Sequence, residues 1–238
     1  MTAPPVVQRI TKRFAWLEIV VVLLACYAPA AISQAIKDKA LSNPAEPAYE
    51  FAATLTEIAI LFYIVWLRDG DLKLFKLGRP KIFPDIGLGL AICFGFFFAN
   101  VLMRMAIPRE LYIHWSSMQK SAPIKDQVNM HLTLWSVLPP LFVVNSFEEL
   151  LMRGYLTGRL LQLMNTKWAP VLISSVIFAS WHIYEGPLGV MNAFIIGLIL
   201  ASIFTVSKRI WPLIIAHFSF DAILTLMYVA YLNYHRHR

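Results

Sequence analysis

Long apolar runs dominate this chain and limit what it can fold into. A transmembrane helix needs about 20 mostly apolar residues. Hydrophobic residues make up 58% of the 238 residues and charged residues 15%, whereas soluble domains have about 45–50% apolar and about 25% charged residues. A soluble fold would have too few polar residues to cover its core, so we predict an all-α, polytopic transmembrane helical bundle. The candidate spans are 14–36, 52–67, 82–107, 131–164, 168–188, 189–207 and 210–232.

The number of spans depends on the fourth run. Residues 131–164 exceed what a hydrocarbon core of about 30 Å requires, and Pro139-Pro140 lies inside the run. Proline removes a helical hydrogen bond, so we expect a bend or an interruption there and seven or eight spans in total. The first run holds Glu18 and is longer than the roughly 7–15 apolar residues of a signal peptide, which favours a span that is retained.

Positive residues gather between alternate runs and predict the orientation. With the N-terminus in the cytoplasm, most Lys and Arg residues lie on the inner side, including the basic loop 69–81 and the pair Lys208-Arg209. The net charge of +7 is explained by this bias, so no nucleic-acid partner is expected. We expect a multi-pass protein of the cell membrane. The loop 69–81 either marks topology only or contacts anionic lipid headgroups.

Two acids and a base interrupt the fourth apolar run. Glu149 and Arg153 are four residues apart, so they share one helix face and can form an ion pair. Glu148 is rotated about 100° from Glu149 and cannot share that pairing. A carboxylate left in a dry site is a candidate general base. A buried ion pair that only fixes helix packing explains Glu149 and Arg153 but does not explain Glu148.

Two later runs carry histidines at comparable depth. His217 and Asp221 are again four residues apart, and His182 lies in the run 168–188. Ionisable groups at membrane depth usually face the bundle interior and one another. If the fifth run enters the membrane near Val171, Glu148 and His182 lie about 16 Å deep and His217 about 12 Å. Taken alone, His182 is explained as a packing residue and the pair of His217 and Asp221 as one that stabilises its helix.

The three motifs together resemble those of the CPBP intramembrane proteases, which include type II CAAX prenyl endopeptidases and bacteriocin-processing or self-immunity proteins. The matching patterns are Glu148-Glu149-x-x-x-Arg153, Phe178-x-x-x-His182 and His217-x-x-x-Asp221. The resemblance covers residues 131–225, which divides the chain into 1–130, without recognisable motifs, and a CPBP-like catalytic core at 131–238. Asp221 departs from the family pattern, which more often has Asn.

The resemblance implies a role for each residue. Glu148 would activate a water molecule with His182 beside it, and His217 with Asp221 would lie near the scissile carbonyl and its oxyanion. Glu149 and Arg153 would support the site. Asp221 can donate a hydrogen bond only when it is protonated, so orienting His217 is the role we assign to it.

A zinc ion is also compatible with these residues. Two histidines and a glutamate form a known zinc set that leaves one position for water. Glu148, His182 and His217 are the candidate ligands, but a metal-free mechanism uses the same side chains. The sequence does not distinguish a zinc-dependent mechanism from a metal-free one.

The leading hypothesis is therefore an intramembrane endopeptidase that acts on a membrane-associated peptide or protein within the lipid bilayer. Neither the substrate, prenylated or not, nor the oligomeric state is readable. One alternative is a non-enzymatic immunity or scaffold protein that keeps these residues for packing. Another is a proton-coupled transporter, because buried Glu and His also relay protons, although no inverted repeat is visible.

Overall fold

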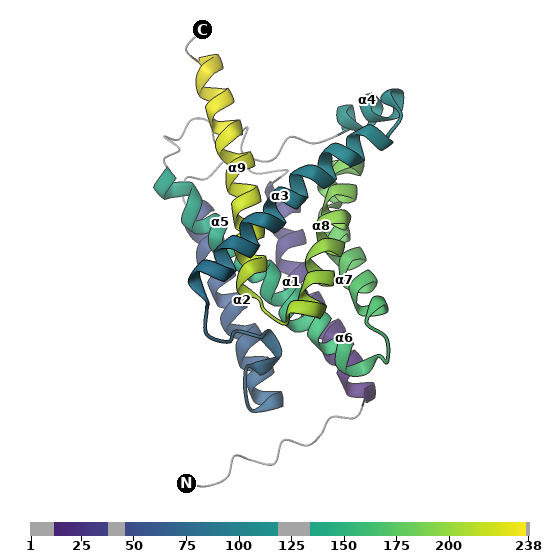
Figure 1. Cartoon of the computed structure of the whole chain (residues 1–238). Coiled ribbons are helices and arrows are strands. Elements are labelled where there is room, and N and C mark those ends of the chain that lie inside the picture. Colours follow the sequence, from purple (N-terminus) through teal and green to yellow (C-terminus); the bar gives the residue numbers. More distant parts are fainter. Residues whose placement is uncertain (1–11, 38–45, 119–133, 237–238) are drawn as a thin grey trace.

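The computed structural model describes residues 12–37, 46–118 and 134–236, and these contain helices and no strand (Figure 1). The predicted all-α bundle is confirmed. In chain order the elements are α1 (Lys12–Lys37), α2 (Glu46–Asp69), η1 (Lys73–Phe75), α3 (Ile82–Ala106), α4 (Arg109–Met118), α5 (Leu134–Glu149), η3 (Leu150–Thr157), α6 (Gly158–Leu163), α7 (Trp168–Trp181), η4 (Ile183–Glu185), α8 (Gly186–Ser207) and α9 (Trp211–Arg236).

Within the described residues, four segments are long and apolar enough to cross a bilayer, at Phe51–Asp69, Ile82–Ala106, Ile183–Ser207 and Trp211–Tyr231. Two shorter apolar helices lie at Phe14–Cys26 and Trp168–Trp181. The chain is thus built as an integral membrane protein, while the count of seven or eight spans stays a prediction. The start of α1 and the end of α9 lie at opposite ends of the bundle (Figure 1).

The fourth apolar run forms one continuous rod of α5, η3 and α6. The helix continues through Pro139 and Pro140, so the predicted interruption is wrong, while the alternative of a bend stays a prediction. Both prolines lie near the start of α5, where only the first available backbone hydrogen bonds are lost. The irregularity comes later instead, because η3 is a π-helix, and the Thr157 hydroxyl donates to the Met152 carbonyl five residues back at 2.8 Å. π-helical segments are rare and often occur at functional sites.

The predicted boundary between the runs 168–188 and 189–207 is wrong. Helix α7 ends at Trp181, and a short 3₁₀ turn, η4, leads into α8 at Gly186. Gly186 has φ 82°, a conformation that glycine adopts without steric cost, and Pro187 begins the new helix. The break therefore precedes the predicted one and places His182 at a helix end.

Part of the connection 108–130 is helical. Helix α4 covers Arg109–Met118, has no buried residue and packs against α8. The guanidinium of Arg104 lies 5.1 Å from the centre of the Tyr112 ring. This part is therefore a surface helix, and residues 119–130 of the connection lie outside the described residues.

The core centres on η3, whose eight residues are all buried. Leu151, Tyr155 and Leu156 are each 0% exposed. Around η3, α7 packs on α8 and α3 packs on α9. A Cβ atom at Gly197 of α8 would lie 3.2 Å from the Ser175 Cα of α7, so glycine permits this close approach. The element that carries Arg153 is consequently enclosed on all sides by packed helices.

A second charged cluster ties α1 and α2 to this rod. Glu18 of α1 accepts hydrogen bonds from Tyr155 at 3.0 Å and from Arg159 at 3.2 Å, and it also pairs with Arg68 of α2. Arg159 is 2% exposed and donates to Asp69 at 2.7 Å. The negative charges of Glu18 and Asp69 balance the positive charges of Arg68 and Arg159. This balance explains why an acidic residue is tolerated in the first apolar run.

We expect Glu18→Gln to lower the free energy of unfolding by about 3 kcal/mol, because it leaves the guanidinium groups of Arg68 and Arg159 with too few negative partners. Thermal unfolding in a neutral detergent measures the loss. Glu18→Gln combined with Arg68→Met restores charge balance and should recover part of it. An unchanged melting temperature in the single variant would show that the cluster does not stabilise the bundle.

Candidate active site

The ion pair predicted from spacing is confirmed. Arg153 Nη1 donates to Glu149 Oε1 at 2.9 Å, and the two side chains are 1% and 0% exposed. Glu149 ends α5 and Arg153 lies one turn later in η3. Burial of either charge alone would cost several kcal/mol, and the pair makes burial of both tolerable.

Glu149 also holds a histidine on another helix. His217 Nδ1 of α9 donates to the same Glu149 oxygen at 2.9 Å. A carboxylate can only accept, so Nδ1 carries a proton, and this contact orients the ring. The Nε2 atom then points away from Glu149. Spacing along one helix predicted the first partner of Glu149, whereas the second comes from a helix distant in sequence.

Two further carboxylates face the free side of the His217 ring. Glu148 Oε2 lies 3.7 Å from His217 Nε2, and Asp221 Oδ2 lies 3.6 Å from it. The predicted proximity of His217 and Asp221 is confirmed. The side chains of Glu148 and Asp221 are 18% and 33% exposed, whereas His217 is 5% exposed. Glu148 and Asp221 are thus the partly exposed members of this group.

Asn145 is a neighbour that sequence reasoning missed. It lies on α5 and is buried, and its Nδ2 donates to Asp221 Oδ2 at 2.6 Å. Asn145 precedes Glu149 by one helical turn, so it shares the face that Glu149 presents to α9. In the sequence, Asn145 was visible as a polar amide side chain within an apolar run. The hydrogen bond orients the Asp221 carboxylate beside His217.

His182 reaches the cluster through Phe178. Its Nδ1 donates to the Phe178 carbonyl at 3.0 Å, and the ring centroids of the two residues lie 4.7 Å apart. Phe178 contacts the His217 ring at 5.9 Å and lies 4.5 Å from the Arg153 guanidinium carbon. This cation–π contact gives the motif phenylalanine a physical role. His182 is also near enough to Glu148 to interact with it electrostatically.

The helix that carries His182 begins at Trp168, not near Val171. His182 caps its C-terminal end. The depth argument therefore does not explain how the residues meet. The link between them is the Phe178 ring of α7, which lies against both histidine rings.

The η4 turn adds two residues beside His182. The Tyr184 ring stacks on the His182 ring at 6.3 Å, and Tyr184 is 38% exposed. Glu185 interacts electrostatically with His182 and Asp221. The sequence could have indicated Glu185 as a candidate site residue, since it is an unexplained carboxylate within the predicted run 168–188. Both residues belong to the turn that directly follows His182.

The candidate zinc ligands do not form a recognisable metal set. In the described ranges, no three His, Cys, Asp or Glu side chains are grouped so that they could hold one ion. His217 Nδ1 is already engaged by Glu149. A zinc requirement therefore stays a prediction, which the metal content of the purified protein tests.

The comparisons with known proteins identify the part of the chain that holds this cluster. Residues 130–223 match the family model of the type II CAAX prenyl endopeptidase Rce1-like proteins. These residues form an Rce1-like domain. The resemblance to CPBP proteases is thereby confirmed. Neither the curated proteins nor the solved structures include a significant match to the chain.

The Rce1-like domain contains every candidate residue, from Glu148 to Asp221. It also contains Asn145, Tyr184 and Glu185. The matching family is one of type II CAAX prenyl endopeptidases, and the long apolar helices independently indicate an integral membrane protein. Helices α1, α2 and α3 lie outside the match and pack against α6, α5 and α9 of the domain, respectively, and the Glu18 cluster also connects α1 to it.

Proposed function

We propose that this protein is an intramembrane endopeptidase in which Glu148 activates water for hydrolysis of a peptide bond. The observation that carries the proposal is the contrast between adjacent glutamates. Glu149 Oε1 accepts hydrogen bonds from both Arg153 and His217, whereas Glu148 faces His217 Nε2 at 3.7 Å and remains partly accessible. A positioned carboxylate in a water-poor site can serve as a general base.

In the proposed reaction, Glu148 takes a proton from water as the oxygen attacks the scissile carbonyl, and His182 holds the water from the other side. The carbonyl oxygen becomes an oxyanion. His217, with protons on both ring nitrogens, donates from Nε2 to that oxyanion while Nδ1 stays on Glu149. Glu148 then gives its proton to the departing amine. Asp221, held by Asn145, orients His217 and does not contact the substrate.

The substrate class we propose is a membrane-associated protein or peptide with a lipid-modified C-terminal segment. The name of the matching family supports a prenylated CAAX-type substrate. A site enclosed by apolar helices also favours a substrate that the bilayer itself delivers. None of the proposed steps depends on a metal ion.

The test is cleavage of a farnesylated CAAX peptide by the purified protein in liposomes. We expect one peptide bond near the C-terminus to be hydrolysed, with the product identified by mass spectrometry. The same peptide without the farnesyl group should be cleaved at least about tenfold more slowly, because it partitions poorly into the membrane. Equal cleavage of both peptides would contradict the substrate class, and cleavage of neither would contradict the proposed activity on such peptides.

A further inference from the structure

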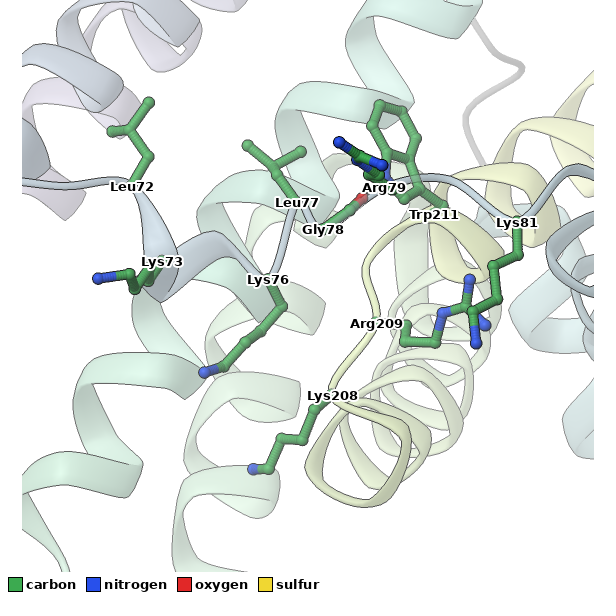
Figure 2. A pocket seen from close by; sticks show the side chains of 10 residues that line it. All are labelled: Leu72, Lys73, Lys76, Leu77, Gly78, Arg79, Lys81, Lys208, Arg209 and Trp211. Atoms are coloured by element: carbon green, nitrogen blue, oxygen red, sulfur yellow. Dashed lines mark hydrogen bonds between the residues drawn. The ribbon is translucent and has the colours of Figure 1, made fainter.

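A basic pocket of about 560 Å³ lies away from the cluster around Glu148, between two connections that are far apart in sequence (Figure 2). One connection joins α2 to α3 and the other joins α8 to α9. The ten lining residues include no acidic residue. Six of them are basic: Lys73, Lys76, Arg79, Lys81, Lys208 and Arg209.

Buried contacts hold the first connection in place. Phe75 is 0% exposed and packs on Gly154 of η3, where a Cβ atom would lie 2.7 Å from the Phe75 ring. Leu74 packs on Gly158 in the same way, at 2.8 Å. The loop therefore rests on the rod that carries Arg153. A loop that only signalled topology would not need such contacts.

The two connections are also joined to each other. Trp211 Nε1 donates to the Gly78 carbonyl at 2.9 Å. Asp85 of α3 accepts from the Lys81 backbone N–H at 2.7 Å and pairs with Arg209 at 2.7 Å. The pocket is thus a fixed structure, made by tertiary contacts that bring separate basic segments together.

Most of the positive charge in the pocket is not neutralised. Arg209 pairs with Asp85, and Lys73 pairs with Asp71 at 2.6 Å. The other four basic residues form no ion pair within the part of the chain that the structure describes. Partial burial and the positive charges of Lys76 and Lys167 lower the pKa of the Lys208 ammonium. A bound anion would relieve this repulsion.

The backbone of two of these lysines is unusual. Lys76 and Lys208 have φ values of 55° and 53°, and each caps the C-terminal end of a helix. Glycine normally occupies this left-handed position, because a side chain incurs a steric cost there. Their side chains extend in the same direction from the two connections (Figure 2). Lysine at both positions therefore suggests that the charge itself has a function.

The surroundings of the pocket match a lipid better than a soluble anion. Ile82 and Phe83 follow Lys81 directly, are 66% and 87% exposed, and begin the apolar span α3. Trp211 has the amphipathic ring typical of membrane interfaces. Cationic groups beside an exposed apolar helix can hold a phosphate while acyl chains lie along that helix. The distribution of positive residues predicts that this end faces the cytoplasm, where anionic lipids gather.

We propose that this pocket binds the phosphate headgroup of an anionic phospholipid, with Lys76 and Lys208 as principal contacts. The inference is independent of the proposed protease activity, since its readout is lipid binding. A basic side chain near an anionic surface contributes about 1 kcal/mol, which is about fivefold in affinity at 25 °C. Two lysines should therefore account for about a 25-fold preference for an anionic over a zwitterionic lipid.

The experiment measures retention of phosphatidylglycerol and phosphatidylcholine by native mass spectrometry of the purified full chain. The test variant is Lys76→Gly with Lys208→Gly. Glycine relieves the left-handed backbone, so we expect an equal or higher melting temperature without lipid, together with loss of the preference to within about threefold. The charge-matched control is Arg104→Gln with Arg109→Gln. Arg104 lies in the last turn of α3 and Arg109 begins α4, at the far end of the bundle, so this variant should keep the preference.

Three other outcomes would each overturn the proposal. An unchanged preference in the lysine variant would show that the pocket does not hold the lipid. Loss of the preference in the arginine control as well would show a general charge effect. Competition by inorganic phosphate as strong as that by phosphatidylglycerol would assign the site to a soluble anion.

Discussion

Replacement of Glu148 by Gln is expected to lower the rate of peptide cleavage by about 10²–10⁴-fold, the usual contribution of a general base. The change keeps the size of the side chain but removes the group that accepts the proton from water. Glu148 contacts His217 only at 3.7 Å, so the fold should tolerate the substitution. The measurement is the initial rate on the farnesylated peptide at equal amounts of folded protein.

The matched control is Glu57→Gln. Glu57 is another glutamate within an apolar helix, on α2, and it lies outside the Rce1-like domain. The same chemical change there should leave the rate within about twofold. Full activity of the Glu148 variant would end the proposed mechanism. Loss of activity accompanied by a large drop in melting temperature would instead assign Glu148 a structural role.

Replacement of Glu149 by Met is expected to reduce both stability and activity. It leaves the Arg153 guanidinium, which is 1% exposed, without its partner, and breaking such a buried pair costs about 3–5 kcal/mol. It also removes the acceptor that orients His217. Loss of an oxyanion donor typically lowers kcat about 10²–10³-fold, and a misoriented His217 should have a similar effect. Thermal unfolding and single-turnover cleavage measure the two losses separately.

A double variant separates the two roles of Glu149. Glu149→Met with Arg153→Met replaces the buried pair by apolar groups of similar volume, a change that is often neutral for stability. We expect stability to recover while activity stays low, because His217 still lacks its acceptor. Recovery of activity together with stability would show that Glu149 serves the fold alone and that His217 needs no orientation.

Contacts within one helix were predictable from the sequence. The spacing of Glu149 and Arg153, and that of His217 and Asp221, follows from 3.6 residues per turn, and both contacts are present. Apolar composition similarly predicted helices throughout. The prediction failed where local backbone geometry decided the outcome, as at Gly186, because one positive φ value separates the η4 turn from α8 without changing the apolar pattern.

Contacts between helices were not predictable in this way. The common depth of His182 and His217 suggested a meeting, but the actual link passes through the Phe178 ring and its contact with Arg153. Asn145 and Glu185 drew no attention because each is a single polar residue in an apolar run. Their relevance depends on which neighbour they face, and that requires the rotation of one helix about its axis relative to another.

The sequence by itself determined a helical membrane protein, a family of proteases, and one helix face that pairs Glu149 with Arg153. Those features depend on composition and on a helical period that is the same in every protein. Only the tertiary structure decided that Glu149 also holds His217, that Glu18 balances Arg159, and that two basic connections form one pocket. Such contacts join residues far apart along the chain, and the packing of side chains between helices, not their spacing in sequence, selects them.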